Sequence, residues 1–586
     1  MSLDIASRIA VSSLMATQVQ MSVASANISN ADTTGYSEKT ANQAAVVSTG
    51  SGAGTTITGI TSSVDKLLLK SLSKSNSELG SANTLNNYLD QLQSLYGSSG
   101  SSSSSGTSIA NTIASLESAI SSLASTTSSA SLQSNAVSSL DDLASQLRST
   151  SSEIQQLRGN ADKDIASSVD DVNQQLKTIA DLNKQIKQVA ASGQSTADLE
   201  DQRNTAVLDI ASKMNVSYFV SSSGGMQVYT SSGQALVDGS VHELSFTAAS
   251  SVSASTTYPS GGLSCITVNG VDVTSQITSG EIGGLINLRD NVLTGAQSQL
   301  DQLANQLSDS LNAVHNQGTS LPPPTTLTGT ATVSSSTALS ATGTVRIAVA
   351  DQKGNLVAYS DLDLSSYSTM GGLVSAINGI SGLSASIDSN GHVVISTTNT
   401  SNGVAINEMS SKVGSSGAGL SDALGLNDLV TGTGASDFAV RSDILSNSGL
   451  LAVSTLDSSS SLTTGSQVLS SGSTTVADGL YSALTASNSY SAEGGLGTTS
   501  GSFSDYAAAI VSNVASKASE AKTTYTSKET TQSTFSSAMS SQSGVNLDEE
   551  TARLSTLQNQ YSAVSELIKT INAMFSSLLT AVQSAN

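Results

Sequence analysis

The sequence predicts an α+β multidomain protein in which helices at both ends of the chain enclose β-rich segments. Apolar residues recur at spacings of three and four in residues 1–28, 165–193 and 554–582, as on one face of a packed helix. From about residue 216 the period shortens to two, which is typical of strands. A chain of 586 residues also allows about four domains of roughly 150 residues each.

The first 28 residues carry two apolar stripes, so this helix is expected to have neighbours on two sides. The first stripe consists of Ala6, Ala10, Leu14, Thr17, Met21, Ala24 and Ile28. The second consists of Ile5, Ile9, Ala16, Val19 and Val23. The polar segment NISNADTTGYS, residues 27–37, then separates this helix from the next regular segment.

Two further helices are expected before the strands begin. One includes residues 85–96 and stops at GSSGSSSSSG, residues 97–106, a composition typical of a flexible loop. The other keeps helical spacing over residues 165–189 and ends at Gly193, which suits the C′ position because glycine adopts positive φ at little cost.

The segment ITVNGVDVT, residues 266–274, predicts a β-hairpin. Its apolar residues alternate on either side of Asn269-Gly270, a pair that supplies the positive φ angles of a type I′ turn. A helix over residues 293–314 follows and ends near Gly318.

Three prolines, residues 322–324, stop both a helix and a central strand. Past them Val345, Ile347 and Val349 alternate with other residues, and residues 325–440 are expected to form an inserted β-rich outer domain. Residues 441–505 are rich in Ser, Gly and Thr and have little pattern.

The C-terminal helix carries a stripe of coiled-coil type. The stripe consists of Leu554, Leu557, Tyr561, Val564, Ile568, Ile571, Phe575, Leu578 and Val582. Full burial supplies about 1.5 to 3 kcal/mol for each such residue, while ordering each helical residue costs roughly 1 to 2 kcal/mol. The helix is therefore marginal alone, and partners must cover it. An intramolecular bundle is the alternative to assembly with other subunits.

These patterns divide the chain into four parts. They are a terminal helical core (1–60 with 540–586), a helical shaft (61–215 with 285–320 and 441–539), a small β-rich domain (216–284) and the inserted outer domain (325–440).

Composition excludes several function classes. A net charge of −22 and a pI near 4.3 argue against a nucleic-acid partner and against an anionic membrane surface. We expect no membrane insertion, because no stretch reaches roughly 18 uninterrupted apolar residues. The N-terminus lacks the pattern of a secretory signal peptide, since Asp4 and Arg8 interrupt it. The single Cys265 cannot form an intramolecular disulfide.

Catalytic chemistry is not indicated. His242, His315 and His392 are expected in a strand, at a helix end and in a hairpin turn respectively, far apart in sequence. The segment HELSF lacks the second histidine of a zinc-protease helix, because Phe246 stands at that position. Residues 388–391 lack the downstream glutamate of a calcium loop and suit a simple turn. We therefore expect no enzyme, no cofactor and no metal site.

Several segments resemble the flagellar axial proteins, a family of rod, hook and hook-associated members. NISNADTTGYS after an N-terminal helix resembles the N-terminal signature of that family, and SGVNLDEETARLSTLQNQ, from residue 543, resembles its C-terminal signature. DLEDQRN at 198–204 and LRDNVLTGAQSQLDQLANQ from residue 288 resemble the hook-associated members. Glu38 departs from the family, which usually carries a basic residue there.

The resemblance implies a structural subunit that joins hook to filament as a junction ring and supports filament assembly. It implies export without a cleaved signal through the flagellar type III apparatus, and an extracellular place at the hook–filament junction. The implied partners are further copies of the chain, hook protein, a second junction protein on the filament side and a cytoplasmic export chaperone at the C-terminal helix.

The same resemblance suggests which residues would make contacts in an assembled tube. Side chains of the polar loop would hydrogen-bond between subunits, Gly35 would permit a turn and Tyr36 would anchor the loop; the loop residues concerned are Asn27, Asn30, Thr33 and Thr34. The alternative is a plain helix-ending turn. Other functions left open are another axial protein, a Ser/Thr-rich secreted adhesin and a peptidoglycan-cutting enzyme, the last without a visible carboxylate pair.

Overall fold

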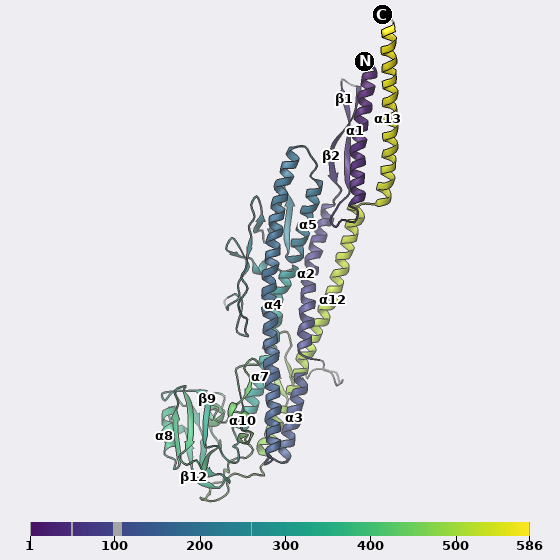
Figure 1. Ribbon diagram of the computed structural model, residues 1–586. Helices are drawn as coiled ribbons and strands as arrows, with labels where there is room; N and C mark the ends of the chain where they lie inside the picture. Colours follow the sequence, from purple (N-terminus) through teal and green to yellow (C-terminus); the bar gives the residue numbers. More distant parts are fainter. Residues whose placement is uncertain (1, 49–50, 98–107, 260, 585–586) are drawn as a thin grey trace.

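The computed structural model describes residues 2–48, 51–97, 108–259 and 261–584 of the chain. The molecule is elongated, with a shaft of long helices, a β-rich domain at one end and two projecting helices at the other (Figure 1). Apart from Gly97, the expected flexible loop at residues 97–106 lies outside the described residues. The predicted α+β class is confirmed.

The shaft is a bundle of helices with one continuous apolar core. Its central helix, α4 (Ala130–Ala191), is 62 residues long. The helices around it are α2 (Lys66–Leu95), α3 (Ile109–Ser125), α5 (Ala197–Lys213), α6 (Gly280–Asn287), α7 (Leu293–His315), α11 (Thr475–Thr485) and α12 (Phe503–Ser543). None of the helices in the described part of the chain has an apolar stretch long enough to cross a membrane.

The helices predicted at residues 85–96, 165–193 and 293–314 are confirmed. Helix α4 begins well before residue 165, because its serine-rich first half also spaces buried residues such as Leu147 and Ile154 along one face. Gly193 has φ +72 and takes the C′ position after α4, as expected.

A π-helical turn, η2 (Leu288–Val292), joins α6 to α7. It carries Arg289, which is fully buried and donates to Asp162 of α4 at 2.7 Å and to Asp290 at 2.8 Å. Arg158 of α4 donates in turn to the Arg289 carbonyl oxygen at 3.1 Å. Since buried guanidinium groups must have their donors paired, this cluster fixes α4 against the α6–α7 unit.

Residues 216–284 form two small antiparallel sheets on the side of the shaft. Their strands are β3 (Val216–Val220), β4 (Met226–Thr230), β5 (Ala235–Val237), β6 (Leu244–Ser245), β7 (Thr267–Val268) and β8 (Val271–Asp272), followed by η1 (Thr274–Gln276). The predicted hairpin is confirmed, with positive φ at Asn269 and Gly270. The expected separate domain is corrected, because Val228 and Ile266 are buried in the core of the shaft.

The terminal module consists of α1 (Ser2–Ser29), β1 (Lys39–Ser48), β2 (Ser51–Ser62) and α13 (Leu547–Ser584). Helices α1 and α13 lie side by side and antiparallel, with both chain termini at their free tip (Figure 1). The strands β1 and β2 form an antiparallel hairpin against α1. The helical core expected at residues 1–60 is corrected in part, because residues 39–48 and 51–62 form strands rather than helix.

The outer domain contains two three-stranded antiparallel sheets, in the orders β12-β11-β15 and β13-β14-β9, around their own apolar core. Val345, Ile347 and Val349 are completely buried there. The elements are β9 (Thr326–Thr332), β10 (Ala341–Thr342), β11 (Thr344–Asp351), β12 (Leu356–Asp363), η3 (Leu364–Ser366), α8 (Met370–Asn378), β13 (Leu383–Ile387), β14 (His392–Thr397), β15 (Asn402–Asn407), β16 (Lys412–Val413) and α9 (Leu420–Leu424).

The outer domain ends before residue 429, earlier than the boundary at residue 440 that the sequence predicted. Leu429 and Phe438 are buried in the core of the shaft, together with the elements β17 (Val430–Thr431), β18 (Ala439–Val440), α10 (Ser442–Ser446) and η4 (Ser448–Leu450). The chain then returns to the outer domain, where Leu456 and Leu469 pack against its strands. Residues 456–469, here called the strap, therefore cover part of that domain. The hairpin β19 (Asn488–Tyr490) and β20 (Thr499–Gly501) leads into α12.

Candidate functional site at the joint of the terminal helices

The terminal module meets the shaft at a joint built from three parts of the chain. The loop after α1 passes the start of α5, α12 ends at Ser543, and α13 begins at Leu547. Backbone hydrogen bonds join these segments: Glu38 N–H donates to the Ser543 carbonyl oxygen at 2.8 Å, and Ser63 N–H donates to the Glu38 carbonyl oxygen at 3.2 Å. Both ends of the sequence are therefore fixed at one place.

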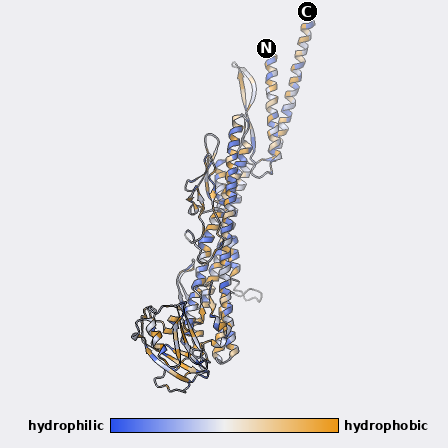
Figure 2. Ribbon diagram, turned by 60° about the vertical axis from the view of Figure 1, so that its left-hand side comes forward, coloured by the Kyte–Doolittle hydropathy of each residue, from blue (hydrophilic) through white to orange (hydrophobic). Residues whose placement is uncertain are grey.

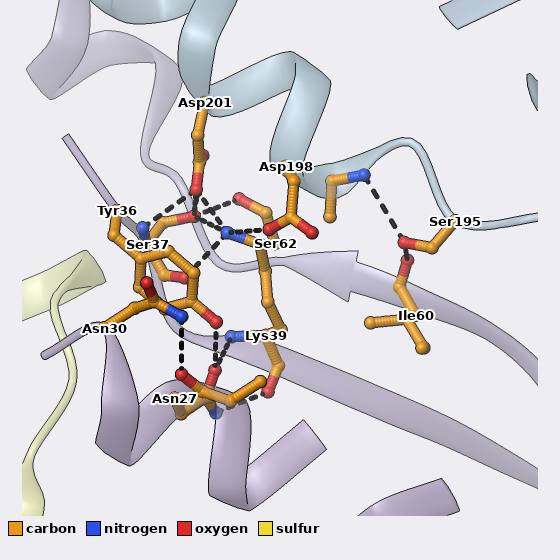
Figure 3. Close-up of polar contacts among 12 residues, drawn as sticks. Asn27, Asn30, Tyr36, Ser37, Lys39, Ile60, Ser62, Ser195, Asp198 and Asp201 are labelled. Carbon is orange, nitrogen blue, oxygen red and sulfur yellow. Dashed lines mark hydrogen bonds and ion pairs between the residues drawn. The ribbon is translucent and has the colours of Figure 1, made fainter. Parts of the chain in front are cut away.

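Asn27, the last buried residue of α1, organises the loop. Its Nδ2 donates to the Lys39 carbonyl oxygen at 2.9 Å, and its Oδ1 accepts from Lys39 N–H at 3.0 Å and from the Tyr36 hydroxyl at 2.9 Å (Figure 3). Burial, together with the charges of Asp198 and Asp201, raises the pKa of Tyr36 to about 12. Asn27 thus makes its polar contacts within the chain. Its side-chain amide bonds to both backbone groups of Lys39, as a neighbouring strand would, and so supports the start of β1.

Gly35 has φ +81, in the left-handed region that other residues adopt at a cost. A Cβ added there would lie 2.4 Å from Thr205 Oγ1 of α5, so both backbone and space require glycine. The Tyr36 N–H donates to the Thr33 carbonyl oxygen at 3.1 Å and closes the turn. Gly35 therefore adopts the left-handed conformation that this turn requires.

The remaining loop residues of the sequence prediction point away from this network. Asn30 Nδ2 donates to the Ala26 carbonyl oxygen at 2.9 Å and satisfies the end of α1. Thr33 and Thr34 are exposed at the surface of the joint. The structure thus brings together Asn27 and Tyr36, and leaves the two threonines open to contact from outside.

Asp201 of α5 contacts the loop on the side of the shaft. Its carboxylate accepts from Ser37 N–H at 2.9 Å and from Ser37 Oγ at 2.7 Å, and it forms an ion pair with Lys39 Nζ (Figure 3). The side chains of Lys39 and Asp201 are only 5% and 7% exposed. Lys39 Nζ also lies 3.9 Å from the ring centroid of Tyr36. Such a buried pair is costly to break, because a lone charge would remain.

The C-terminal stripe is covered on one side only. Leu557 and Ile571 are 6% and 5% exposed in the interface with α1, whereas Leu578 is 56% exposed. The other stripe residues are half-buried, except Val582, which is exposed; the half-buried ones are Leu554, Tyr561, Val564, Ile568 and Phe575. An intramolecular pair therefore buries part of the stripe, contrary to the expectation that only outside partners cover it.

Helix α1 shows the same division between covered and uncovered apolar residues. Every residue of its first stripe is buried or half-buried. In the second stripe Ile5, Ile9 and Val19 are exposed, at 48%, 37% and 36%. Figure 2 shows apolar residues along both projecting helices, beyond the end of the shaft. The module thus presents an apolar surface that the chain itself does not cover.

The three histidines do not converge. His315 is buried at the end of α7, where Nδ1 contacts the Asn427 carbonyl oxygen at 2.5 Å and Nε2 accepts from Ala452 N–H at 2.8 Å. Burial lowers the pKa of His315 to about 4. His392 begins β14 after the turn at Asp388, while His242 lies just outside a strand beside Asp238. Within the described ranges no group of His, Cys, Asp and Glu side chains could hold a metal ion.

Sequence reasoning missed Ser37, Lys39 and Asp201 as partners. The sequence does carry a signal, because these residues lie in or beside two family-like motifs, GYS at 35–37 and DLEDQRN at 198–204. Nothing in the spacing of residues separated by more than 160 positions indicates that they touch.

The chain is similar to known proteins over most of its length. Residues 89–330 match the family described as the flagellar hook-associated protein FlgK helical domain. Residues 8–36 match the flagella basal body rod protein family, and residues 536–581 match the C-terminal family of the flagellar basal body rod FlgEFG proteins. The two terminal matches contain the loop after α1 up to Tyr36 and the C-terminal stripe up to Leu578.

Individual relatives agree with these families. Flagellar hook-associated protein 1 of Escherichia coli K12 is 24% identical over 434 residues, which cover 71% of this chain and 70% of that protein. The protein of the same name from Salmonella typhimurium LT2 is 31% identical over 157 residues, 26% of this chain and 28% of the relative. The solved flagellar hook junction protein FlgK from Burkholderia pseudomallei has a similar fold, with a TM-score of 0.50 and 18% identity over 80% of this chain and 99% of that one.

Proposed function

The chain belongs to the family of flagellar hook-associated protein 1, and from this premise we propose that its terminal module is the part that assembles it into the junction between hook and filament. Its role is structural, in the bacterial flagellum. The observation that carries the proposal is the antiparallel pair of α1 and α13, which projects from the shaft and leaves apolar side chains exposed.

The uncovered surface has the chemistry of a helix-packing interface. Ile5 and Ile9 on α1, and Leu578 and Leu579 on α13, are 37% to 60% exposed near the free tip of the pair. Complete burial of such a side chain contributes about 1.5 to 3 kcal/mol, and the fraction that is still exposed here would be gained on assembly. Neighbouring copies of the same module, packed around a common axis, would cover this surface and form a ring.

The exposed loop residues would lie where one subunit approaches the next. Thr33 and Thr34 are exposed at the surface of the joint, where Thr33 Oγ1 donates to Asn30 Oδ1 at 3.4 Å, in contrast to the buried Asn27. Their side chains would hydrogen-bond to a neighbouring subunit. The hydrogen bond from Ser37 to Asp201 and the ion pair between Lys39 and Asp201 would hold this loop on the shaft during assembly.

The partners we propose follow from the family and from the place of the module. They are hook protein on one side of the ring and a second junction protein on the filament side. Before assembly, the C-terminal stripe from Leu554 to Leu578 would bind a cytoplasmic export chaperone, which would shield its apolar residues. We propose that the chain leaves the cell through the flagellar type III apparatus without a cleaved signal.

A deletion strain complemented with variants tests this function. Loss of the chain should leave hooks without filaments and release monomeric flagellin into the medium. The wild-type chain should restore filaments, and Leu578→Asp should not, because a charge would then face the apolar interface. Ser577→Asp, an exposed neighbour with the same added charge, is the matched control. Normal filament counts with Leu578→Asp would refute the proposed interface.

A further inference from the structure

A second group of charged residues lies at the joint, beside the Lys39–Asp201 pair. Glu550, in the first turn of α13, is only 2% exposed. Its Oε1 lies 3.3 Å from Arg553 Nη1, while its Oε2 is buried and has no hydrogen-bond partner. A buried carboxylate oxygen without a donor costs free energy, so a missing donor must be identified.

Glu38, on the loop after α1, faces this group. Its Oε1 lies 3.8 Å from Arg553 Nη1, and Oε1 of Glu550 lies 3.3 Å from the same nitrogen, so the two carboxyl groups share one guanidinium group. Two carboxylates and one guanidinium leave one negative charge uncompensated. A single proton would neutralise the group and would also supply the donor that Glu550 Oε2 lacks.

We infer that Glu38 carries a proton and donates it to Glu550 Oε2, so that the joint between the N-terminal loop and the C-terminal helix is a proton-dependent lock. The bond would link residues at opposite ends of the sequence. It would act beside the backbone bond from Glu38 N–H to the Ser543 carbonyl oxygen, which closes the same joint. This lock does not depend on the proposed assembly surface, because it lies at the other end of the projecting helices.

The surrounding charges agree with a proton at this place. Burial, followed by the charge of Glu550, raises the pKa of Glu38, while Arg553 acts in the opposite direction. The other charged or titratable groups facing the joint are Glu549 of α13, Asp198 and Asp201 of α5, and Tyr36 and Lys39 of the N-terminal segment. Of the three carboxylates besides the pair, Glu549 acts directly on Glu38 and disfavours a second negative charge there.

The sign of the pH dependence follows from the raised pKa. A carboxyl group with a higher pKa in the folded state takes up a proton on folding. The lock is therefore complete below the ordinary glutamate pKa, and it weakens as pH rises through the raised pKa of Glu38. At higher pH, two charged carboxylates would face each other and the joint would open more often.

Hydrogen exchange of the full-length chain measures this opening directly. The readout is the protection of backbone amides in residues 36–41 and 545–553, corrected for intrinsic exchange rates, between pH 5 and pH 8.5. The wild-type chain should lose protection several-fold as pH rises. Glu38→Gln should keep its protection across the range, because an amide donates to Glu550 Oε2 without a titrating proton.

Controls separate the lock from general electrostatics. Asp548→Asn removes one exposed carboxylate from the same helical turn and should retain the wild-type pH response. Glu38→Lys should abolish the pH dependence of protection, because its ammonium group would form an ion pair with Glu550 at every pH tested. It replaces Glu38→Gln as the test variant if that variant misfolds. A wild-type chain with constant protection, or a Glu38→Gln variant that loses protection as the wild type does, would overturn the inference. Protection that changes with sodium chloride concentration but not with pH would also overturn the inference.

Discussion

Lys39 and Asp201 are separated by 162 residues, yet their side chains form a buried ion pair beside the ring of Tyr36. The pair joins the first strand after α1 to the first turns of α5. Together with the backbone hydrogen bonds from Glu38 to Ser543 and from Ser63 to Glu38, it attaches the terminal module to the shaft.

Removing one member of this pair should destabilise the joint strongly. Asp201→Ala leaves the Lys39 ammonium group buried and removes the acceptor of Ser37, at an expected cost of about 3 to 5 kcal/mol. Lys39→Met combined with Asp201→Leu should cost less than Asp201→Ala alone, because no lone charge remains. A double-mutant cycle, measured by chemical denaturation, tests this. Additive effects of the two single changes would show that the side chains are not coupled.

Ile571 and Leu578 lie on one stripe but should respond differently to a charge. Ile571→Asp should lower the melting temperature of the terminal module in the free chain, because Ile571 is 5% exposed against α1. Leu578→Asp should leave that temperature almost unchanged and affect assembly only, since Leu578 is 56% exposed. Circular dichroism melting of both purified variants measures the contrast. Equal effects on the free chain would mean that α13 is covered along its whole length.

His315 should make the connection between shaft and outer domain sensitive to acid. Its pKa is about 4 in the folded chain and near 6.5 when exposed, so the unfolded state binds the proton first. Stability from the neutral ring is complete above about pH 6.5 and declines as pH falls towards 4, by roughly 3 kcal/mol in total.

Urea unfolding of the wild-type chain and of His315→Gln tests this acid sensitivity. The glutamine amide can donate to Asn427 and accept from Ala452 without titrating. The difference in unfolding free energy between the two chains should therefore shrink between pH 7 and pH 4.5. Parallel curves at all pH values would exclude His315 as the source.

The outer domain should be removable only along its observed boundaries. Replacing residues 325–425 with a short linker should leave the shaft folded if Leu456, Val468 and Leu469 of the strap are also changed to serine, since these cover the domain. Replacing residues 325–440 should destabilise the shaft, because it removes Leu429 and Phe438 from its core. Thermal unfolding of both deletions compares them. Equal stability would show that residues 429–440 contribute nothing to the shaft.

Sequence patterning predicted elements wherever local spacing determines structure. The stripes of α1 and α13, the C′ glycine at Gly193 and the turn at Asn269-Gly270 all depend on residues a few positions apart, and all are present. The hairpin at residues 39–62 was missed because two register shifts and several glycines interrupt its alternation.

The partners at the joint were beyond prediction for a different reason. Asn27, Gly35 and Tyr36 belong to one short motif, and their grouping was expected from that motif. Asp201 and Glu550 reach the same place only through the packing of α5 and α13. The domain boundary near residue 429 likewise depends on which core receives Leu429, and an apolar residue packs equally well in either.

The antiparallel pairing of α1 with α13 also imposes an order on folding. These helices are joined by more than 500 residues of intervening chain, so their contacts have nearly the largest sequence separation that the molecule allows. Closing a loop of that length is entropically unfavourable until the intervening shaft has folded and brought the two ends together. Whichever end of the chain is available first must wait for the other. The projecting pair can therefore form only after the whole chain has been synthesised and the shaft between the two helices has folded.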